Sequence, residues 1–348
     1  MSNKRPHKKL PVALIFSLLG LLFLVLFIAD LLLGSIIIPV KQVLLSFFPQ
    51  SATTETFRTI VMEFRLPKAV TAVLTGAALS LSGLQMQTVF RNPLAGPYVL
   101  GLSSGGSLGV ALLIMGSSFL GGSFAVMAQS KYAVILAASL GSFVVLLLVI
   151  ATLWRVSNAM ALLIIGLMVA SFTSAIVSVL SYFTTAENLQ QYVFWSMGSL
   201  GRLDWQDLGL LSVVLLIGIL ICISLLKKLN AFLLGEDHAR SMGVNTKNTR
   251  FLMIAITGIL AGSVTAFAGP IAFIGLTIPH LARQLLNTGN HFVLLPAILL
   301  IGSLVMLLCE TLSQLPGSAY VLPLNAVTSF IGAPIVIWLI LKKQNLIF

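Results

Sequence analysis

Charged side chains are scarce in this chain. Only 8% of its 348 residues are Asp, Glu, Lys or Arg, whereas 58% are apolar. Soluble domains carry roughly 25% charged and 45–50% apolar residues, so a soluble fold could not hide this much apolar surface. The apolar runs extend over about 20 residues rather than alternating over about ten, which favours transmembrane helices over a closed barrel. The sequence therefore predicts an all-α polytopic membrane protein.

Other scarce features exclude classes of chemistry. The two cysteines, Cys222 and Cys309, lie in apolar runs and offer neither a disulfide framework nor a metal spacing. No Gly-Lys pair and no H-E-x-x-H occur, which excludes a phosphate-binding loop of the Walker type and a zinc-protease helix. Of the acids, only Asp30 and Glu310 come close to the apolar runs. An ion-coupled secondary transporter or channel, and an intramembrane lipid-modifying enzyme, therefore stay as weaker alternatives, since both need buried ionisable groups.

The apolar runs divide the chain into ten predicted spans within a single permease domain, residues 1–348. The spans are 11–33, 67–87, 97–115, 132–153, 159–181, 207–226, 251–268, 270–286, 293–313 and 323–341. The first run is too long for the apolar region of a signal peptide and lacks a clear cleavage site, so we interpret it as an uncleaved span. Pro270, Gly275 and Pro279 predict that the segment 270–286 is short, tilted or broken.

The basic residues are distributed unevenly between the two sides of this topology. Fourteen of the 20 lie on the side of the two termini and six on the other. The positive-inside rule then makes both termini cytosolic. The net charge of +11 is thereby explained by cytosolic loops, without a nucleic-acid partner.

The same side carries a polar island, residues 229–250, with the sequence LNAFLLGEDHARSMGVNTKNTR. Gly235 and Gly243 bracket a helix-capable piece, 236–242, whose carboxylates Glu236 and Asp237 fall in its first turn, where the helix dipole favours them. Two interpretations stay open from the residues alone: an ordinary cytosolic loop, or a docking element for a soluble partner.

Small and hydroxylic residues mark two of the predicted spans. Ser171, Ser174, Ser178 and Ser181 share one helix face because they are three and four residues apart. This face is either a packing seam or a mildly polar wall of a pathway. The glycines and serines of 101–109 favour close helix packing.

Two patterns concern the segments that enter the spans. Arg65-Leu-Pro-Lys68 opens the second span from outside, either as an interface anchor or as a docking point for carboxylates of an external protein. Residues 95–102 and 268–276 are similar in sequence, and the two spans that they open run in opposite directions. This pattern predicts an inverted internal repeat.

Seven stretches, in this order and spacing, carry a resemblance to a known family. They are Arg65-Leu-Pro-Lys68, Gly76-Ala-Ala-Leu-Ser-Leu-Ser-Gly83, Arg91-Asn-Pro-Leu-Ala95 with Leu100-Gly-Leu-Ser-Ser-Gly105, Trp195-Ser-Met-Gly198, Leu234 to Gly243, Ala268 to His280, and Leu324 to Pro334. Together they resemble the membrane-spanning subunits of the type II ABC importers, the iron-siderophore, haem and vitamin B12 permease family.

The resemblance implies a ten-helix permease in the cytoplasmic (inner) membrane that pairs with a second copy of itself around a central pathway. Two cytosolic ABC ATPases are implied below it and a substrate-binding protein above it. ATP and Mg would be held by the ATPases, so the permease is expected to bind no cofactor or metal and to catalyse no reaction. The implied substrate is an iron-siderophore, haem or cobalamin-type metal chelate.

The resemblance also assigns roles to individual residues. Segment 229–250 matches the family's coupling loop of two short helices, and Arg65 and Lys68 match basic positions that meet the binding protein. Gln314 stands where a further basic residue is expected, and Ser157 and Asn158 match the inner gate. The serine face lies on the helix that lines the pathway in the family, which favours the pathway interpretation. The centre of the coupling loop comprises Leu234, Gly235, Glu236, Asp237, His238, Ala239, Arg240, Ser241, Met242 and Gly243.

Overall fold

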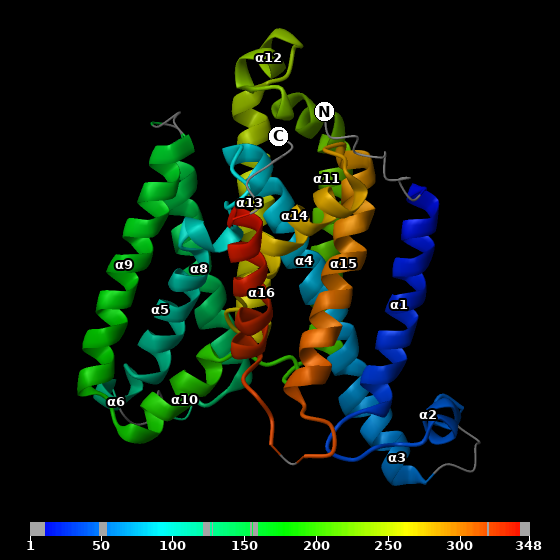
Figure 1. The fold of residues 1–348 in the computed structure, drawn as a ribbon. Helices are drawn as coiled ribbons and strands as arrows, with labels where there is room; N and C mark the ends of the chain where they lie inside the picture. Colours follow the sequence, from blue (N-terminus) through cyan, green and yellow to red (C-terminus); the bar gives the residue numbers. More distant parts are fainter. Residues whose placement is uncertain are drawn as a thin grey trace.

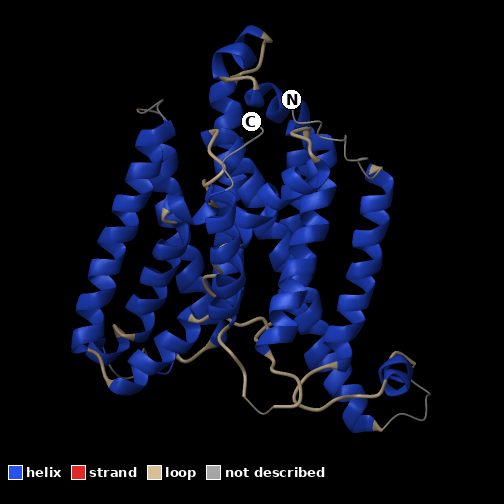
Figure 2. Cartoon of the chain, in the orientation of Figure 1, coloured by secondary structure: helices blue, strands red, loops and turns tan. Residues whose placement is uncertain are grey.

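A computed structural model describes residues 11–48, 54–120, 126, 128–153, 155, 159–318 and 320–341. Within these ranges every regular element is a helix (Figure 2). The longer helices are α1 (Val12–Leu32), α4 (Leu66–Phe90), α8 (Lys131–Leu153), α9 (Ala159–Phe183), α11 (Trp205–Leu233), α13 (Thr246–Ala268), α15 (His291–Ser313) and α16 (Leu324–Leu341). The shorter ones are α2 (Val40–Ser46), α3 (Glu55–Thr59), the π-helix η1 (Ile60–Arg65), the 3-10 helix η2 (Pro97–Leu100), α5 (Leu102–Ile114), α6 (Ser117–Leu120), α10 (Ala186–Ser196), α12 (Glu236–Ser241) and α14 (Ile274–Leu286).

Each of the ten predicted spans overlaps a helix, and the span 97–115 overlaps two, η2 and α5, which confirms the all-α membrane fold. In the described part of the chain, seven helices are long and apolar enough to cross a bilayer, and α5 and α16 are shorter apolar helices. The number of ten crossings therefore stays a prediction. α1 begins and α16 ends at the end of the bundle that carries α12, whereas α2, α3 and α10 lie at the other end (Figure 1).

Two predicted spans are shortened by their backbone. Within 97–115 the chain forms η2, then passes through Gly101 at φ 76°, and α5 starts only at Leu102. Within 270–286 the helix α14 starts at residue 274, because Gly269 at φ 80° and Phe273 at φ 68° interrupt the backbone. The expectation that this segment is short is confirmed.

The two segments that resemble each other in sequence meet in space. The hydroxyl of Tyr98, in the first, accepts a hydrogen bond from the backbone N–H of Ile271, in the second, at 3.1 Å. Gly275 is also so close to Pro97 that a Cβ built on it would lie 2.8 Å from the proline ring. This contact fits an inverted repeat, which stays a prediction.

Helix α4 forms the centre of the bundle and packs against α15, α13, α14 and α11. Its contacts depend on glycine: Gly76 lies on the backbone of Gly302, and Gly83 lies on the carbonyl group of Gly275. Any Cβ at either position would overlap with backbone atoms of the neighbouring helix. Small residues allow this close approach, which drives helix association where both surroundings are apolar.

Helices α5 and α8 make a second close crossing of the same kind. A Cβ built on Gly105 would lie 2.5 Å from the carbonyl oxygen of Gly141, and one built on Gly109 would lie 2.1 Å from the carbonyl oxygen of Ala137. The predicted role of residues 101–109 in close packing is confirmed.

Candidate functional site

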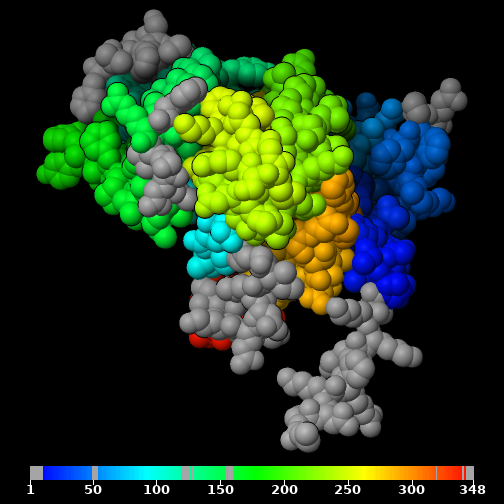
Figure 3. All heavy atoms as spheres, turned by 90° about the horizontal axis from the view of Figure 1, so that it is seen from above, coloured from blue at the N-terminus to red at the C-terminus, as the bar shows by residue number. Residues whose placement is uncertain are grey.

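The part of the polar island between α11 and α13, residues 234–245, projects from one end of the molecule (Figure 1). We call this segment the hook. Gly235 at φ 112° and Gly243 at φ 80° turn the chain on either side of α12, as the sequence predicted. The expectation of two short helices is wrong in one respect. α11 continues to residue 233 and α13 already begins at 246, which leaves α12 as the single short helix between them. Figure 3 looks onto this end and shows the hook, in yellow-green, over the middle of the face.

The outer surface of the hook combines polar and large apolar side chains. Leu234 is 64% exposed and Met242 60% exposed, although both lie beyond the ends of the long helices. Ala239, by contrast, is fully buried and faces the rest of the molecule. Exposed Leu and Met side chains among polar neighbours are typical of surfaces that a protein partner covers.

The hook is tied firmly to α13. The Arg250 guanidinium, buried in the first turns of α13, donates a hydrogen bond to Glu236 and forms an ion pair with it. Arg240 lies 3.9 Å from the same carboxylate, and the backbone N–H of Val244 donates to the carbonyl of Ala239 at 3.0 Å. The hook is therefore positioned to move together with α13.

A buried polar chain connects the base of the hook to the core. The Asn230 side-chain oxygen on α11 accepts the backbone N–H of His291 at 2.9 Å and lies 2.8 Å from its ring Nδ1. The other ring nitrogen lies 2.9 Å from the hydroxyl of Thr88 on α4. The Asn230 amide also donates to Asn290 at 3.0 Å. These bonds link α4, α11 and α15, which are far apart in sequence. The sequence offered no sign of the link, because no regular spacing relates these residues.

A second polar link joins α4 to α14 at the same end. The Gln87 amide donates to the carbonyls of Pro93 and Leu276, at 2.8 and 2.9 Å. Its oxygen accepts a hydrogen bond from the Arg283 guanidinium at 2.5 Å. Gln87 thereby holds the turn after α4 and the start of α14 in one unit.

Most of the serine face of α9 does not pack inside the chain. The side chains of Ser171, Ser174 and Ser178 are exposed, and Ser181 is half-buried. The hydroxyls of Ser171, Ser178 and Ser181 donate to carbonyls of their own helix, at 2.8–3.0 Å. Ser181 also donates to the sulfur of Met115 at 3.7 Å, so only this end of the serine face contacts another part of the chain and no packing seam runs along the whole face. Ser157 and Asn158, the predicted gate residues, lie outside the described residues.

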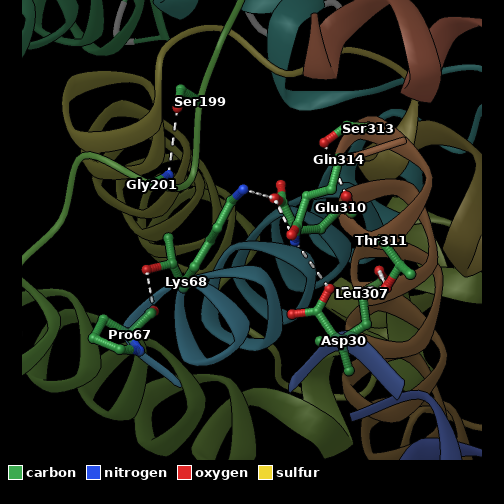
Figure 4. A network of polar contacts seen from close by, with 11 residues as sticks. Asp30, Pro67, Lys68, Ser199, Gly201, Leu307, Glu310, Thr311, Ser313 and Gln314 are labelled. Atoms are coloured by element: carbon green, nitrogen blue, oxygen red, sulfur yellow. Dashed lines mark hydrogen bonds and ion pairs between the residues drawn. The ribbon is translucent and has the colours of Figure 1, made fainter. Parts of the chain in front are cut away.

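A charged cluster fills the space between α1, α4 and α15 at the opposite end (Figure 4). Lys68 Nζ lies 2.5 Å from a carboxylate oxygen of Glu310, which is 2% exposed. Gln314 donates to Glu310 at 3.3 Å, and Asp30 accepts a hydrogen bond from Thr311 at 2.8 Å. Lys68 is thus held by an internal carboxylate.

Arg65 lies beside this cluster but faces inward. It is 6% exposed, and its guanidinium donates to the backbone carbonyls of Leu31 and Leu32, at 2.8 and 2.9 Å, and to that of Ile36. In this conformation Arg65 closes the turn after α1 and is not a surface cation. The docking roles of Arg65 and Lys68 stay predictions.

The connection into α11 at this end is fixed by a carboxylate. Asp204 accepts the backbone N–H groups of Gln206 and Asp207, at 3.1 and 3.0 Å, and lies 2.9 Å from Lys131 Nζ. The hydrogen bond from the Asp207 backbone, followed by the one from Lys131, lowers the pKa of Asp204 to about 2. The described residues contain no group of three His, Cys, Asp or Glu that could hold a metal ion.

Comparison with known proteins adds to this geometry. The FecCD transport family matches residues 21–342. The vitamin B12 import system permease proteins BtuC of Salmonella typhimurium and Salmonella newport are each 37% identical over 286 residues, which cover 82% of this chain and 84% of theirs.

Two solved structures are similar in fold. One, described as an inward-facing conformation of a metal-chelate type ABC transporter, has a TM-score of 0.81 and 32% identity, and the match covers 95% of this chain and 99% of that one. PsaBC from Streptococcus pneumoniae, in complex with a Fab, has a TM-score of 0.54 at 15% identity and shares the fold alone. The relatives are named as permeases, a non-catalytic translocation role. This chain is therefore a multi-pass membrane permease and belongs to the FecCD transport family.

Proposed function

We propose that two copies of this chain form the pathway of an ATP-driven ABC importer for a metal chelate of the iron-siderophore, haem or cobalamin class. The relatives named as vitamin B12 permeases support cobalamin most directly. Two ATPases would dock on the hooks from the cytosol, and a binding protein would deliver the chelate at the opposite end. Both termini are then cytosolic, in the inner membrane.

The observation that carries this proposal is the rigid hook with an exposed apolar tip. Leu234 and Met242 offer contact area to a partner, while the bonds of Glu236 to Arg250 connect the hook to α13. When ATP closes the two ATPases, each hook is displaced and takes α13 with it. Asn230 and His291 pass the displacement on to α15 and α4. A packed interface that has two arrangements responds to such a displacement by switching rather than by bending.

The exposed serine face of α9 supports the pathway. Hydroxyls that already bond to their own helix present a polar but weakly binding wall. A bulky chelate can pass such a wall without being retained. We place this face, together with α16, opposite the same elements of the second copy.

Binding of the ATPase tests the proposal directly. Leu234→Asp and Met242→Asp should each weaken binding of the cognate ATPase to the purified permease by more than tenfold, because a charge would be buried in the contact. The unfolding midpoint should stay unchanged, since both side chains are exposed. Tyr320→Asp, at an 80% exposed residue of the opposite end, is the matched control. Undiminished ATPase binding by both hook variants would refute the docking role.

Cross-linking tests the pairing of two copies. Ser174→Cys should form an intermolecular disulfide in membranes under mild oxidation, because its helix face would meet the second copy. Cys222 and Cys309 are buried and should not react. Leu220 on α11 is 57% exposed, and Leu220→Cys should stay monomeric. Equal cross-linking of both variants would contradict the proposed interface.

Lys68 lies at the end of the bundle that the binding protein would face. It is partly exposed and already paired with Glu310, so a carboxylate of the binding protein would share or replace that partner. Arg65 would have to leave three backbone carbonyls to take part. We therefore propose Lys68 as the first docking contact and Arg65 as a contact that requires rearrangement.

A further inference from the structure

A cavity of about 500 Å³ opens beside the hook, between the end of α8 and the start of α13. Its lining combines basic, polar and apolar side chains. These are Leu153, Glu236, Arg240, Lys247, Asn248, Arg250, Phe251 and Leu252. Neither the proposed pathway nor the contact of the hook tip uses this cavity.

The lining carries an excess of positive charge. Three cations face one carboxylate, and that carboxylate, Glu236, is already engaged by Arg250 and approached by Arg240. Lys247 is exposed and makes no hydrogen bond or ion pair with any residue that the structure describes. The charges therefore favour an anion in the cavity.

The position of the cavity along the bundle indicates which anion. Leu153 is the last residue of one helix long enough to span the membrane, and Lys247 is the second residue of another. The cavity thus lies at the level of lipid headgroups. On its apolar side Phe251 remains 37% exposed. Basic pockets between transmembrane helices bind the headgroups of anionic lipids. In such a pocket the cations would bind the headgroup phosphate, and the apolar side would contact the acyl chains.

We propose that this cavity binds an anionic phospholipid, with its headgroup phosphate between Lys247 and Arg240 and its glycerol and first methylenes beside Phe251 and Leu153. The inference depends on the proposed function only for the assignment of the cavity to the inner leaflet. Lipid bound there would lie against the root of the hook and would stabilise the junction of α12 and α13.

Native mass spectrometry of the purified full-length permease tests this. The probe is phosphatidylglycerol, with phosphatidylcholine as the zwitterionic comparison. Lys247→Gln should weaken phosphatidylglycerol binding about fivefold, which corresponds to about 1 kcal/mol for one basic residue at a membrane surface. Lys247→Arg should retain the affinity. Lys227→Gln is the matched control, since Lys227 is an exposed lysine of the same end that does not line the cavity.

Four outcomes would overturn the proposal. Equal binding of both lipids to the wild-type chain would show that charge plays no part. An equal loss of phosphatidylglycerol binding in Lys227→Gln would show that a general attraction to the basic surface, and not binding in the cavity, accounts for the affinity. Competition by soluble glycerol 3-phosphate at the same concentration as the lipid would assign the site to a free phosphate. An effect of Lys247→Gln on ATPase binding alone, with lipid binding unchanged, would likewise assign Lys247 to the protein contact.

Discussion

Asn230 offers the sharpest test of how the hook is connected to the core. Its side-chain oxygen accepts the backbone N–H of His291 and faces the ring Nδ1, and His291 is completely buried. Asn230→Ala leaves both of these groups without their partner. A buried polar group without a partner costs about 1–3 kcal/mol, so for the two groups together we expect a loss of about 2–6 kcal/mol in the free energy of unfolding.

Asn188→Ala is the matched control for this variant. The Asn188 amide donates to the hydroxyls of Ser117 and Ser118, at 3.2 and 2.8 Å. Ser117 also donates to the carbonyl of Ile114, and Ser118 is exposed, so neither hydroxyl is left buried without a partner. The control should therefore cost less than about 1 kcal/mol.

Unfolding in mixed detergent–SDS micelles, followed by circular dichroism, measures both variants on one scale. A thiol-reactive dye gives a second readout, because Cys222 and Cys309 are buried until the bundle opens. Asn230→Asp keeps the oxygen acceptor and should recover most of the lost stability. Equal destabilisation by Asn230→Ala and Asn188→Ala would refute the argument that burial of His291 sets the cost.

Three further predictions concern other contacts. Gly83→Val should lower the free energy of unfolding by about 1–3 kcal/mol or more. The valine side chain would overlap with the backbone of Gly275, and overpacking has this cost. Gly20→Val, where no atom lies within 4 Å of a built Cβ, should cost far less in the same SDS titration. Lys68→Met leaves Glu310 buried without its partner and should cost about 3–5 kcal/mol, whereas the double variant Lys68→Met with Glu310→Leu should recover much of it; a double variant no more stable than the single would contradict this. Asp204→Ala should lower the melting temperature at pH 7. Because the folded state lowers the pKa of Asp204 to about 2, the stability that it adds is present above its ordinary pKa of 3.8 and is lost as the pH falls towards 2. The difference in melting temperature from wild type should therefore shrink below pH 4, and a constant difference would count against a charge effect.

Much of this fold follows from local composition. Apolar length located the helices within a few residues, and the two glycines at 235 and 243 bracketed α12 correctly. The ends of α11 and α13 were less predictable. The predicted span ends at residue 226, yet α11 continues through Lys227 and Lys228, whose exposed side chains are compatible with a helix that leaves the bilayer.

The partners of buried polar side chains could not be predicted. Lys68 is paired with Glu310 across more than 200 residues of sequence, and Thr88 meets His291 across a similar separation. Such pairs depend on how helices cross, which hydropathy does not encode. Arg65 shows the same limit: a cation at the start of a span is typical of an interface anchor, but here the turn after α1 surrounds it.

The uneven burial of the helices has a consequence for the transport movement. In the most apolar stretch of the segment Glu55–Phe90, which ends with α4, 83% of the residues are buried inside this chain. In the corresponding stretch of α9 the share is 17%. Helix α4 is fixed by glycine contacts with α14 and α15 and by the bonds of Gln87 and Thr88, so a displacement of the hook shifts it together with its neighbours. Helix α9 has one contact of this kind, where Gly166 lies on the backbone of Val99 and Leu100, and most of its residues are not buried inside this chain. If two copies pair as proposed, we expect the change between open and closed pathways to be concentrated where α9 would meet the second copy, while α4, α14 and α15 move as one body.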